Sequence, residues 1–171
     1  MYKRQEETGA TLRQNADLKA VHAARASGMV ALADDSGLEV DALAGAPGVR
    51  SARFAGEPPD DAMNRKALLA AMSGVPQEDR DARFVCAVTI ATPEGFVWTS
   101  EGVVNGTILD RERGSRGFGY DSVFLLPDGR TFAELLDEEK NAMSHRSAAI
   151  RKILPQLQRV LVEKPSRRTV R

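Results

Sequence analysis

The chain has 171 residues, in which 24 lysines and arginines balance 24 aspartates and glutamates. This length suits one domain with a substantial core and is short for two, and the balanced charge gives no electrostatic reason to expect binding to nucleic acid or to a membrane surface. The single cysteine, Cys86, excludes an internal disulfide, and without a secretory signal or a long apolar run the sequence favours a cytoplasmic protein.

The first predicted element is a helix from Leu12 to Ser27. Thr11 and Gln14 have the spacing of a capping box at its start. A short buried strand, residues 29–33, follows, and a glycine-rich irregular segment then contains a second short strand, residues 38–43. The N-terminal part therefore predicts one helix and two short strands.

The middle of the chain predicts a second helix and three strands. The helix begins near Asp60 and ends at Gly74. Segments rich in β-branched and aromatic residues predict strands at 82–91 and 96–109, joined by a TPEG turn, and a shorter strand at 122–126. The two long strands are therefore expected to form a hairpin.

The last predicted element is a helix whose cap is Ser144. Helices alternate with strands and one long hairpin, which predicts an α/β fold with a mixed sheet. There is no internal repeat, so we expect one domain over residues 1–171. Its basic end, residues 163–171, lacks apolar periodicity and is expected to be frayed and solvated.

Two adjacent carboxylates, Asp34 and Asp35, directly follow the predicted strand 29–33, where like charges repel unless a cation lies nearby. The first helix rises about 24 Å and six extended residues recover about 20 Å, so the pair returns toward the start of that helix. Glu7 and Lys19 lie there in the sequence. Carboxylates from two segments suit Mg²⁺ bound to a phosphate, although each acid alone would equally well cap a helix or a turn.

The segment before the third short strand combines charge, glycine and aromatic residues. Residues 110–117 (DRERGSRG) form either a solvated connector or a mobile flap. The next motif, GFGYD at residues 117–121, sets Phe118 and Tyr120 beside glycines, where either ring could stack on a flat ligand. The same pattern is common where aromatic residues fill a core at a bend.

A cationic cluster surrounds the expected start of the last helix. With Ser144 as its cap, His145 and Arg146 occupy the first turn beside unpaired N–H groups, a place suited to an anion or to a ligand rich in carbonyl groups. Lys140 can join them. The alternative is that His145 is simply satisfied near a helix end.

Four stretches together resemble the inosine/xanthosine triphosphate pyrophosphatase family: ETGATLRQNADLKA, ADDSGLEVDALAGAPGVRSARFAG, GFGYDSVF and EKNAMSHRSAA. They occur in family order between Glu6 and Leu161. The resemblance implies an elongated mixed α/β fold of the ITPase-like, Maf-like type, with a sheet flanked by helices, and a homodimer. It also implies Mg²⁺-dependent hydrolysis of ITP, dITP or XTP to the monophosphate and pyrophosphate, which cleanses the nucleotide pool.

The resemblance also implies roles for individual residues. Glu7 and Asp35 match the metal ligands, and Asp35 matches the acceptor of a proton from the attacking water. Lys19 matches a lysine directed at the phosphates, and residues 118–121 match the segment that stacks on and reads the purine. The implied substrate contacts are Lys19, Ser36, Phe118, Gly119, Tyr120, Asp121, Lys140, His145 and Arg146.

The start of the chain departs from the family pattern. Family members begin with a strand that ends in a Thr/Ser-x-Asn-x-x-Lys turn, and residues 1–5 (MYKRQ) do not match it. We therefore interpret the chain as a fragment without its first strand. The alternatives are a nucleotide-binding or dimerisation module without turnover, and a broader nucleotide phosphatase that lacks the base preference. Ser122 and Gln14 replace the usual proline and glutamate.

Overall fold

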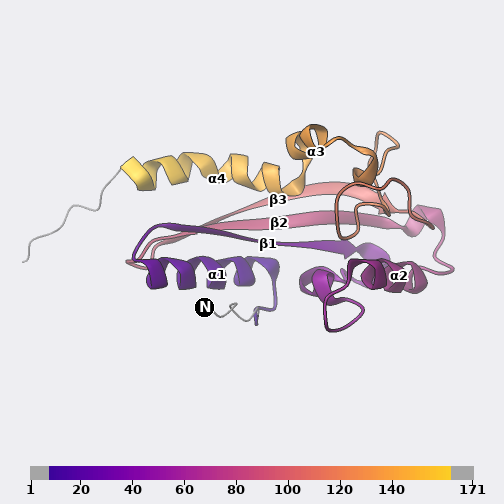
Figure 1. The fold of residues 1–171 in the computed structure, drawn as a ribbon, viewed down its shortest axis with the longest axis horizontal. Coiled ribbons are helices and arrows are strands. Elements are labelled where there is room, and N and C mark those ends of the chain that lie inside the picture. The colour runs from indigo at the N-terminus through magenta and orange to yellow at the C-terminus, as the bar shows by residue number, and fades with distance from the viewer. Residues whose placement is uncertain (1–7, 163–171) are drawn as a thin grey trace, which may run out of the picture.

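The computed structural model describes residues 8–162, in which an elongated sheet carries helices on both faces (Figure 1). One face holds α1 and α2, and the opposite face holds α3 and α4. This arrangement confirms the α/β fold with a sheet flanked by helices. Among residues 8–162, no helix combines the length and the apolar character needed to span a bilayer. The helices are α1 (Leu12–Ser27), α2 (Asp61–Ala71), α3 (Asp137–Met143) and α4 (His145–Val162).

The sheet has the order β1-β2-β3-β4, and each described pairing is antiparallel. The sequence predicted a mixed sheet, so the strand directions are a difference. Val40 at the end of β1 pairs with Ala82 at the start of β2, so the connection between them leaves and re-enters the sheet at the same end. Such a connection can only join antiparallel strands. The strands are β1 (Ala31–Val40), β2 (Asp81–Ala91), β3 (Val97–Ile108) and β4 (Phe124–Leu125).

The predicted start of α1 is confirmed. The Thr11 hydroxyl accepts a hydrogen bond from the Gln14 N–H at 3.1 Å. The Gln14 side chain accepts from the Ala10 N–H at 2.7 Å, one residue before the position that a capping box uses. Gly28 ends the helix in the left-handed conformation with φ of 67°. Helix α2 likewise starts as predicted, because the Asp60 carboxylate caps it by accepting from the Met63 N–H.

The prediction of two short strands at 29–33 and 38–43 is wrong, because one continuous strand, β1, covers residues 31–40. Its partner β2 supplies a ladder along the whole length, which holds Asp34 and Asp35 inside the strand rather than beyond its end. Gly37 permits this path, since a Cβ there would lie 2.4 Å from the Gly48 carbonyl oxygen. Successive strand residues face opposite sides of a sheet, so the two carboxylates separate.

The predicted hairpin is confirmed, and β2 and β3 pair from Ala91 and Val97 onward without interruption. The predicted strand 122–126 is shorter than expected. The Val123 N–H donates to the Tyr120 carbonyl at 3.0 Å in a turn, so strand pairing covers Phe124–Leu125 alone. The hairpin therefore forms the long axis of the sheet, and its far end carries the loops around the site.

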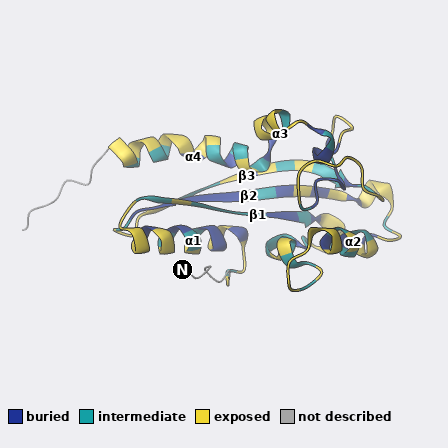
Figure 2. Cartoon of the chain, in the orientation of Figure 1, coloured by how far each residue is buried: buried dark blue, intermediate teal, exposed yellow. Residues whose placement is uncertain are grey.

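The largest buried cluster lies at the end of the sheet near α2 and β4 (Figure 2). Phe84 of β2 anchors it, with its ring 4.6 Å from that of Phe124. A second cluster under α4 contains Cys86, which is fully buried. These two clusters give the loops that follow β3 and precede α4 a rigid support.

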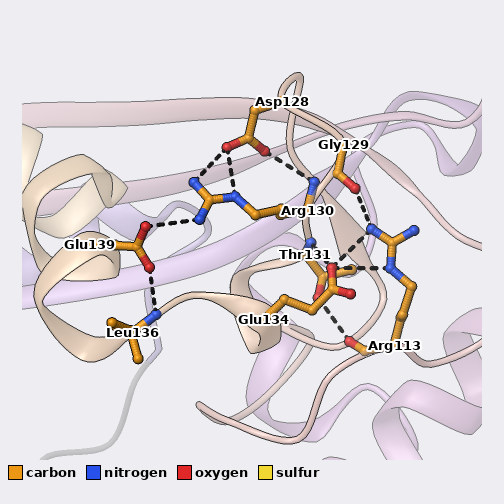
Figure 3. Close-up of polar contacts among 8 residues, drawn as sticks. All are labelled: Arg113, Asp128, Gly129, Arg130, Thr131, Glu134, Leu136 and Glu139. Carbon is orange, nitrogen blue, oxygen red and sulfur yellow. Dashed lines mark hydrogen bonds and ion pairs between the residues drawn. The ribbon is translucent and has the colours of Figure 1, made fainter.

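The segment between β3 and α3 is tied together by ion pairs on the surface (Figure 3). Arg113 donates to Glu134 at 2.9 Å, and Arg130 bridges Asp128 and Glu139, each at 2.8 Å. The hydrogen bonds from the Arg130 guanidinium lower the pKa values of Asp128 and Glu139. Arg113 thus anchors the loop 110–117 to Glu134. Arg130 links α3 to the turn at residues 127–130 that precedes it.

The cap of α4 is the predicted one, because the Ser144 hydroxyl accepts from the Ser147 N–H at 3.2 Å. The helix continues through Pro155 to Val162. The expected frayed tail, residues 163–171, lies outside the described residues, as do residues 1–7.

Candidate functional site

A cavity of about 580 Å³ lies between β1, the start of α2 and the segment that leads into α4. Residues far apart in the sequence meet there, because α2, the turn at 117–121 and α4 pack around the same end of the sheet. Most of the substrate contacts that the sequence predicted are brought together in its wall. They are Ser36, Phe118, Gly119, Tyr120, Asp121, Lys140, His145 and Arg146.

The turn at residues 117–121, which we call the GFGYD turn, is organised around the buried carboxylate of Asp121. This carboxylate accepts from the Phe118 N–H at 2.8 Å and forms a short ion pair with the Lys140 ammonium. A Cβ at Gly117 would lie 2.0 Å from an Asp121 oxygen, and the backbone there has φ of +79°. Glycine is therefore required at residue 117 for both space and conformation.

The two aromatic residues of the turn behave differently. The Phe118 side chain is 64% exposed, and the Lys140 nitrogen lies 4.5 Å from the centre of its ring. The Tyr120 ring is buried, and its hydroxyl donates to the Ser51 carbonyl at 2.8 Å. Burial, with the nearby charge of Asp61, raises the pKa of Tyr120. Phe118 thus offers a surface for stacking beside a cation, whereas Tyr120 anchors the turn.

His145 occupies the first turn of α4, as predicted, and stacks on Phe84 with ring centres 4.9 Å apart. Burial, followed by the charges of Arg146 and Lys140, lowers the pKa of His145 to about 4. Its Nδ1 atom is buried and has no hydrogen-bond partner among the described residues. The histidine is therefore neutral at pH 7 and is not satisfied near its helix end, which argues against the structural alternative.

Arg146 is held at the mouth of the cavity by a carboxylate from β1. Its Nε donates to Asp34 at 2.9 Å. The Ser36 hydroxyl also reaches Asp34, at 3.4 Å. Cys86 lies below this pair, and burial raises the pKa of its thiol to about 11, so the thiol stays protonated. The cation expected beside the paired aspartates is, for Asp34, the guanidinium of Arg146.

Asp35 lies on the opposite face of β1, against α1. Lys19 donates to one carboxylate oxygen at 2.7 Å, and the Asn15 amide donates to the other at 3.2 Å. Asn15 is itself 1% exposed, and its oxygen accepts from the Gly9 N–H at 2.8 Å. Asp35 therefore returns to the first half of α1, as helix and strand lengths predicted, but Asp35 and Lys19 do not line the cavity.

The sequence predicted two metal ligands, Glu7 and Asp35, and the structure describes Asp35 alone. Glu7 lies outside the described residues, so its convergence with Asp35 stays a prediction. Residues 8–162 contain no group of three or more histidine, cysteine or acidic side chains that could hold a metal ion. Mg²⁺ commonly takes one or two carboxylates and completes its shell with water and substrate phosphate. The carboxylate of Asp35, which faces α1 and its Lys19, fits that donor chemistry.

Four residues at the site escaped the sequence reasoning: Asn15, Asp61, Arg65 and Phe84. Asn15 precedes Lys19 by four residues, so both lie on one face of α1, and this spacing was the signal that could have found it. Asp61 and Arg65 have the same spacing on α2. No local pattern points to Phe84, because it contacts His145 through the fold alone.

The chain is similar to known proteins over most of its length. The Ham1 family model matches residues 1–156. A protein of Desulforamulus reducens named "dITP/XTP pyrophosphatase" is 53% identical over 158 residues, covering 92% of this chain and 79% of the relative. The solved structure of the Staphylococcus aureus Ham1 protein aligns with a TM-score of 0.84 and 43% identity over 90% of this chain and 79% of that one. A Ham1 protein from Coxiella burnetii gives 0.86 and 42% over 92% and 81%.

Proposed function

The chain belongs to the Ham1 family, and we propose that it hydrolyses the deaminated purine nucleoside triphosphates ITP, dITP and XTP to the monophosphate and pyrophosphate. The name of the Desulforamulus reducens relative supports this substrate class. The structural observation that carries the proposal is the cavity itself. Its wall includes Phe118 with its exposed ring, Lys140, and His145, whose buried Nδ1 has no hydrogen-bond partner among the described residues.

Base selection follows from the hydrogen-bonding groups in this wall. A flat purine would stack on Phe118 beside Lys140. Hypoxanthine and xanthine present an oxygen at C6, which can accept from Arg146 or from an N–H of the neutral His145. Adenine presents an amino donor at that position, and a donor facing a donor leaves both groups unpaired at a cost of about 1 to 3 kcal/mol for each buried group.

The position of β1 explains how one nucleotide would reach both faces. β1 is the edge strand of the described sheet. Ser36 belongs to the cavity wall, and its neighbour Asp35 faces α1. A nucleotide with its base in the cavity would therefore carry its phosphates over the β1 edge at these two residues. Lys19, which pairs with Asp35, is a cation on that side.

The chemistry on the α1 side rests on Asp35. Its carboxylate would accept the proton of a water molecule as the water oxygen attacks the α-phosphorus and the bond to the bridging oxygen breaks, releasing pyrophosphate. Lys19 and Asn15 fix the orientation of this carboxylate. Mg²⁺, which Asp35 and Glu7 would hold, supplies neutralisation of the triphosphate charge.

The test is pyrophosphate release from ITP, dITP and XTP against ATP and GTP, first with Mg²⁺ and then with EDTA. We expect kcat/KM for ITP to exceed that for ATP by about a hundredfold, because the adenine amino group and the protein donor that faces it would both be left unpaired in the complex. EDTA should stop release. Retained ITP binding without release would support a binding module instead, and equal turnover of ATP would support a broad phosphatase. The homodimer stays a prediction, which light scattering would test.

A further inference from the structure

Helix α2 holds the GFGYD turn by both backbone groups of one residue. The Gly119 N–H donates to an Asp61 carboxylate oxygen at 2.7 Å. The Gly119 carbonyl accepts from Arg65 Nη1 at 2.9 Å. Asp61 and Arg65 are four residues apart, so they share one face of the helix. Two residues of α2 thus hold the Gly119 backbone through both its N–H and its carbonyl.

The connection continues past the end of the turn. Arg65 Nε donates to Glu112 at 2.9 Å, and the Ser122 hydroxyl donates to the same Glu112 oxygen at 2.8 Å. The Arg65 side chain is 19% exposed, far less than that of Glu112 at 47%. Hydrogen bonds from a sheltered guanidinium are stronger than those of an ordinary surface arginine. Arg65 therefore ties α2 to both Gly119 and the residue that follows the turn.

The turn's own contacts hold Phe118 through Asp121 and hold Tyr120 through Ser51, whereas the Gly119 backbone between them is held by α2. Gly117 and Gly119 have φ of +79° and +58°, conformations that glycine reaches without favouring them. The ring of Phe118 is 64% exposed, so packing does not set its position. The contacts from Asp61 and Arg65 place the Gly119 backbone, which in turn places the Phe118 ring opposite the rest of the cavity.

We propose that Asp61 and Arg65 are positioning residues for base selection, holding the GFGYD turn so that Phe118 stacks with the purine edge against His145 and Arg146. The inference rests on the proposed function. It predicts an effect on KM and on the preference for ITP over ATP. It predicts little effect on kcat, since Asp35 lies on the other face of β1.

The variants Asp61→Ala and Arg65→Ala test the inference, with Lys66→Ala as the matched control because Lys66 is an exposed cation on the same helix. Losing one charge-assisted hydrogen bond should raise KM for ITP about tenfold and lower the ITP/ATP ratio of kcat/KM by a similar factor. kcat should stay within about twofold of the wild-type value. Asp61→Asn keeps an acceptor oxygen, so its KM for ITP should lie much closer to the wild-type value than that of Asp61→Ala.

A second measurement follows the turn without any nucleotide. Amide exchange of the Gly119 N–H should accelerate in Asp61→Ala and stay unchanged in Lys66→Ala. Folded variants with the wild-type KM and ITP/ATP ratio would overturn the inference, and so would a lowered Tm with both quantities unchanged, since that marks a purely structural role. Absence of ITP binding and turnover in the wild-type chain would instead overturn the proposed function, and the base-selection role with it.

Discussion

The residues on the two faces of β1 are held in place by different kinds of contact. On the α4 face, the cavity collects side chains from the GFGYD turn, α3 and α4, and Asp61 of α2 reaches it from the α1 face of the sheet. On the α1 face, Asp35 is held by Lys19 and Asn15 of the single helix that precedes it. In the proposed function, recognition would therefore depend on the tertiary fold, whereas the chemistry would depend on one helix and one strand. Changes on the first face should act on KM and selectivity, and changes on the second should act on kcat.

The largest effect is expected from Asp35→Asn. The amide cannot accept a proton, so kcat should fall by about a thousandfold or more. The amide oxygen of the variant can still accept from Lys19, so Tm should stay within about 5 °C of the wild-type value. Pyrophosphate release measures the chemistry assigned to the α1 face, and calorimetry of ITP binding measures the recognition assigned to the α4 face. Asp41→Asn is the control for a charge lost from an exposed site. Unchanged turnover would remove Asp35 from the mechanism.

Gly117→Ala should damage recognition without touching the carboxylate on the other face. The added Cβ would lie 2.0 Å from an Asp121 oxygen at a residue with φ of +79°. The turn must shift, so KM for ITP should rise by roughly 10- to 100-fold at nearly constant kcat. The control is Gly95→Ala, which has φ of +96° but open space around it. Steady-state kinetics on both variants measure KM for ITP. A wild-type KM in Gly117→Ala would contradict the role of the GFGYD turn in recognition.

Acid should weaken the α4 face through His145. Burial and the charges of Arg146 and Lys140 lower its pKa from 6.5 to about 4, against a small opposing effect of Asp34. Between these two values the unfolded chain binds more protons than the folded one. Stability therefore falls as the pH drops from about 6.5 toward 4, by about 2 kcal/mol between pH 7 and pH 5.

Urea unfolding at pH 7 and pH 5 checks this pH dependence. His145→Asn should lose most of the decline in unfolding free energy, because no group at that position can then take up a proton. His22→Asn removes the other, exposed histidine and should keep the decline. A slope that survives in His145→Asn and disappears in His22→Asn would contradict the role given to the buried imidazole.

Arg146→Ala should reduce selectivity more than it slows hydrolysis. Removing the guanidinium would take away the proposed donor to the C6 oxygen, and it leaves Asp34 without its 2.9 Å partner. The ITP/ATP ratio of kcat/KM should fall about tenfold, as expected for the loss of one charged donor. Arg159→Ala removes an exposed arginine from the same helix and serves as the control. If the ratio holds in Arg146→Ala, the base-edge role of Arg146 is wrong.

The sequence predicted those features whose cause is local. Capping by Thr11 and Ser144 depends on residues within one turn, and both caps are present. The prediction of two short strands between residues 29 and 43 was wrong because the length of β1 is set by its partner β2. The two strands are 50 residues apart in sequence at the middle of the ladder, where Ser36 pairs with Cys86. No local pattern contains that information.

The candidate site shows the same division. The motifs that hold Phe118, Lys140 and Arg146 were visible as stretches of sequence, and the fold brings them into one cavity wall. The separation of Asp34 from Asp35 was not visible, since it follows from the continuous strand. The grip of Asp61 on Gly119 joins residues 58 apart and likewise required the structure.

The smallest effect is expected from Arg130→Ala, which breaks the surface network shown in Figure 3. Arg130 links Asp128 to Glu139 on α3, the helix that carries Lys140. These pairs are exposed, and exposed ion pairs contribute little, so KM for ITP should change by less than about twofold. Because Arg130 lowers the pKa values of both carboxylates, its stabilisation is present above about pH 4.5 and is lost as the pH falls through their lowered pKa values.

Unfolding curves at pH 7 and pH 3 should therefore differ slightly between wild type and Arg130→Ala at the higher pH and converge at the lower one. The exposed Lys66→Ala supplies the control for the loss of a surface cation. A KM increase in Arg130→Ala as large as that of Gly117→Ala would show that α3 is placed by this network rather than by packing against α4. Lys140 would then owe its position over Phe118 to surface charges, and recognition on the α4 face would depend on salt concentration as well as on the fold.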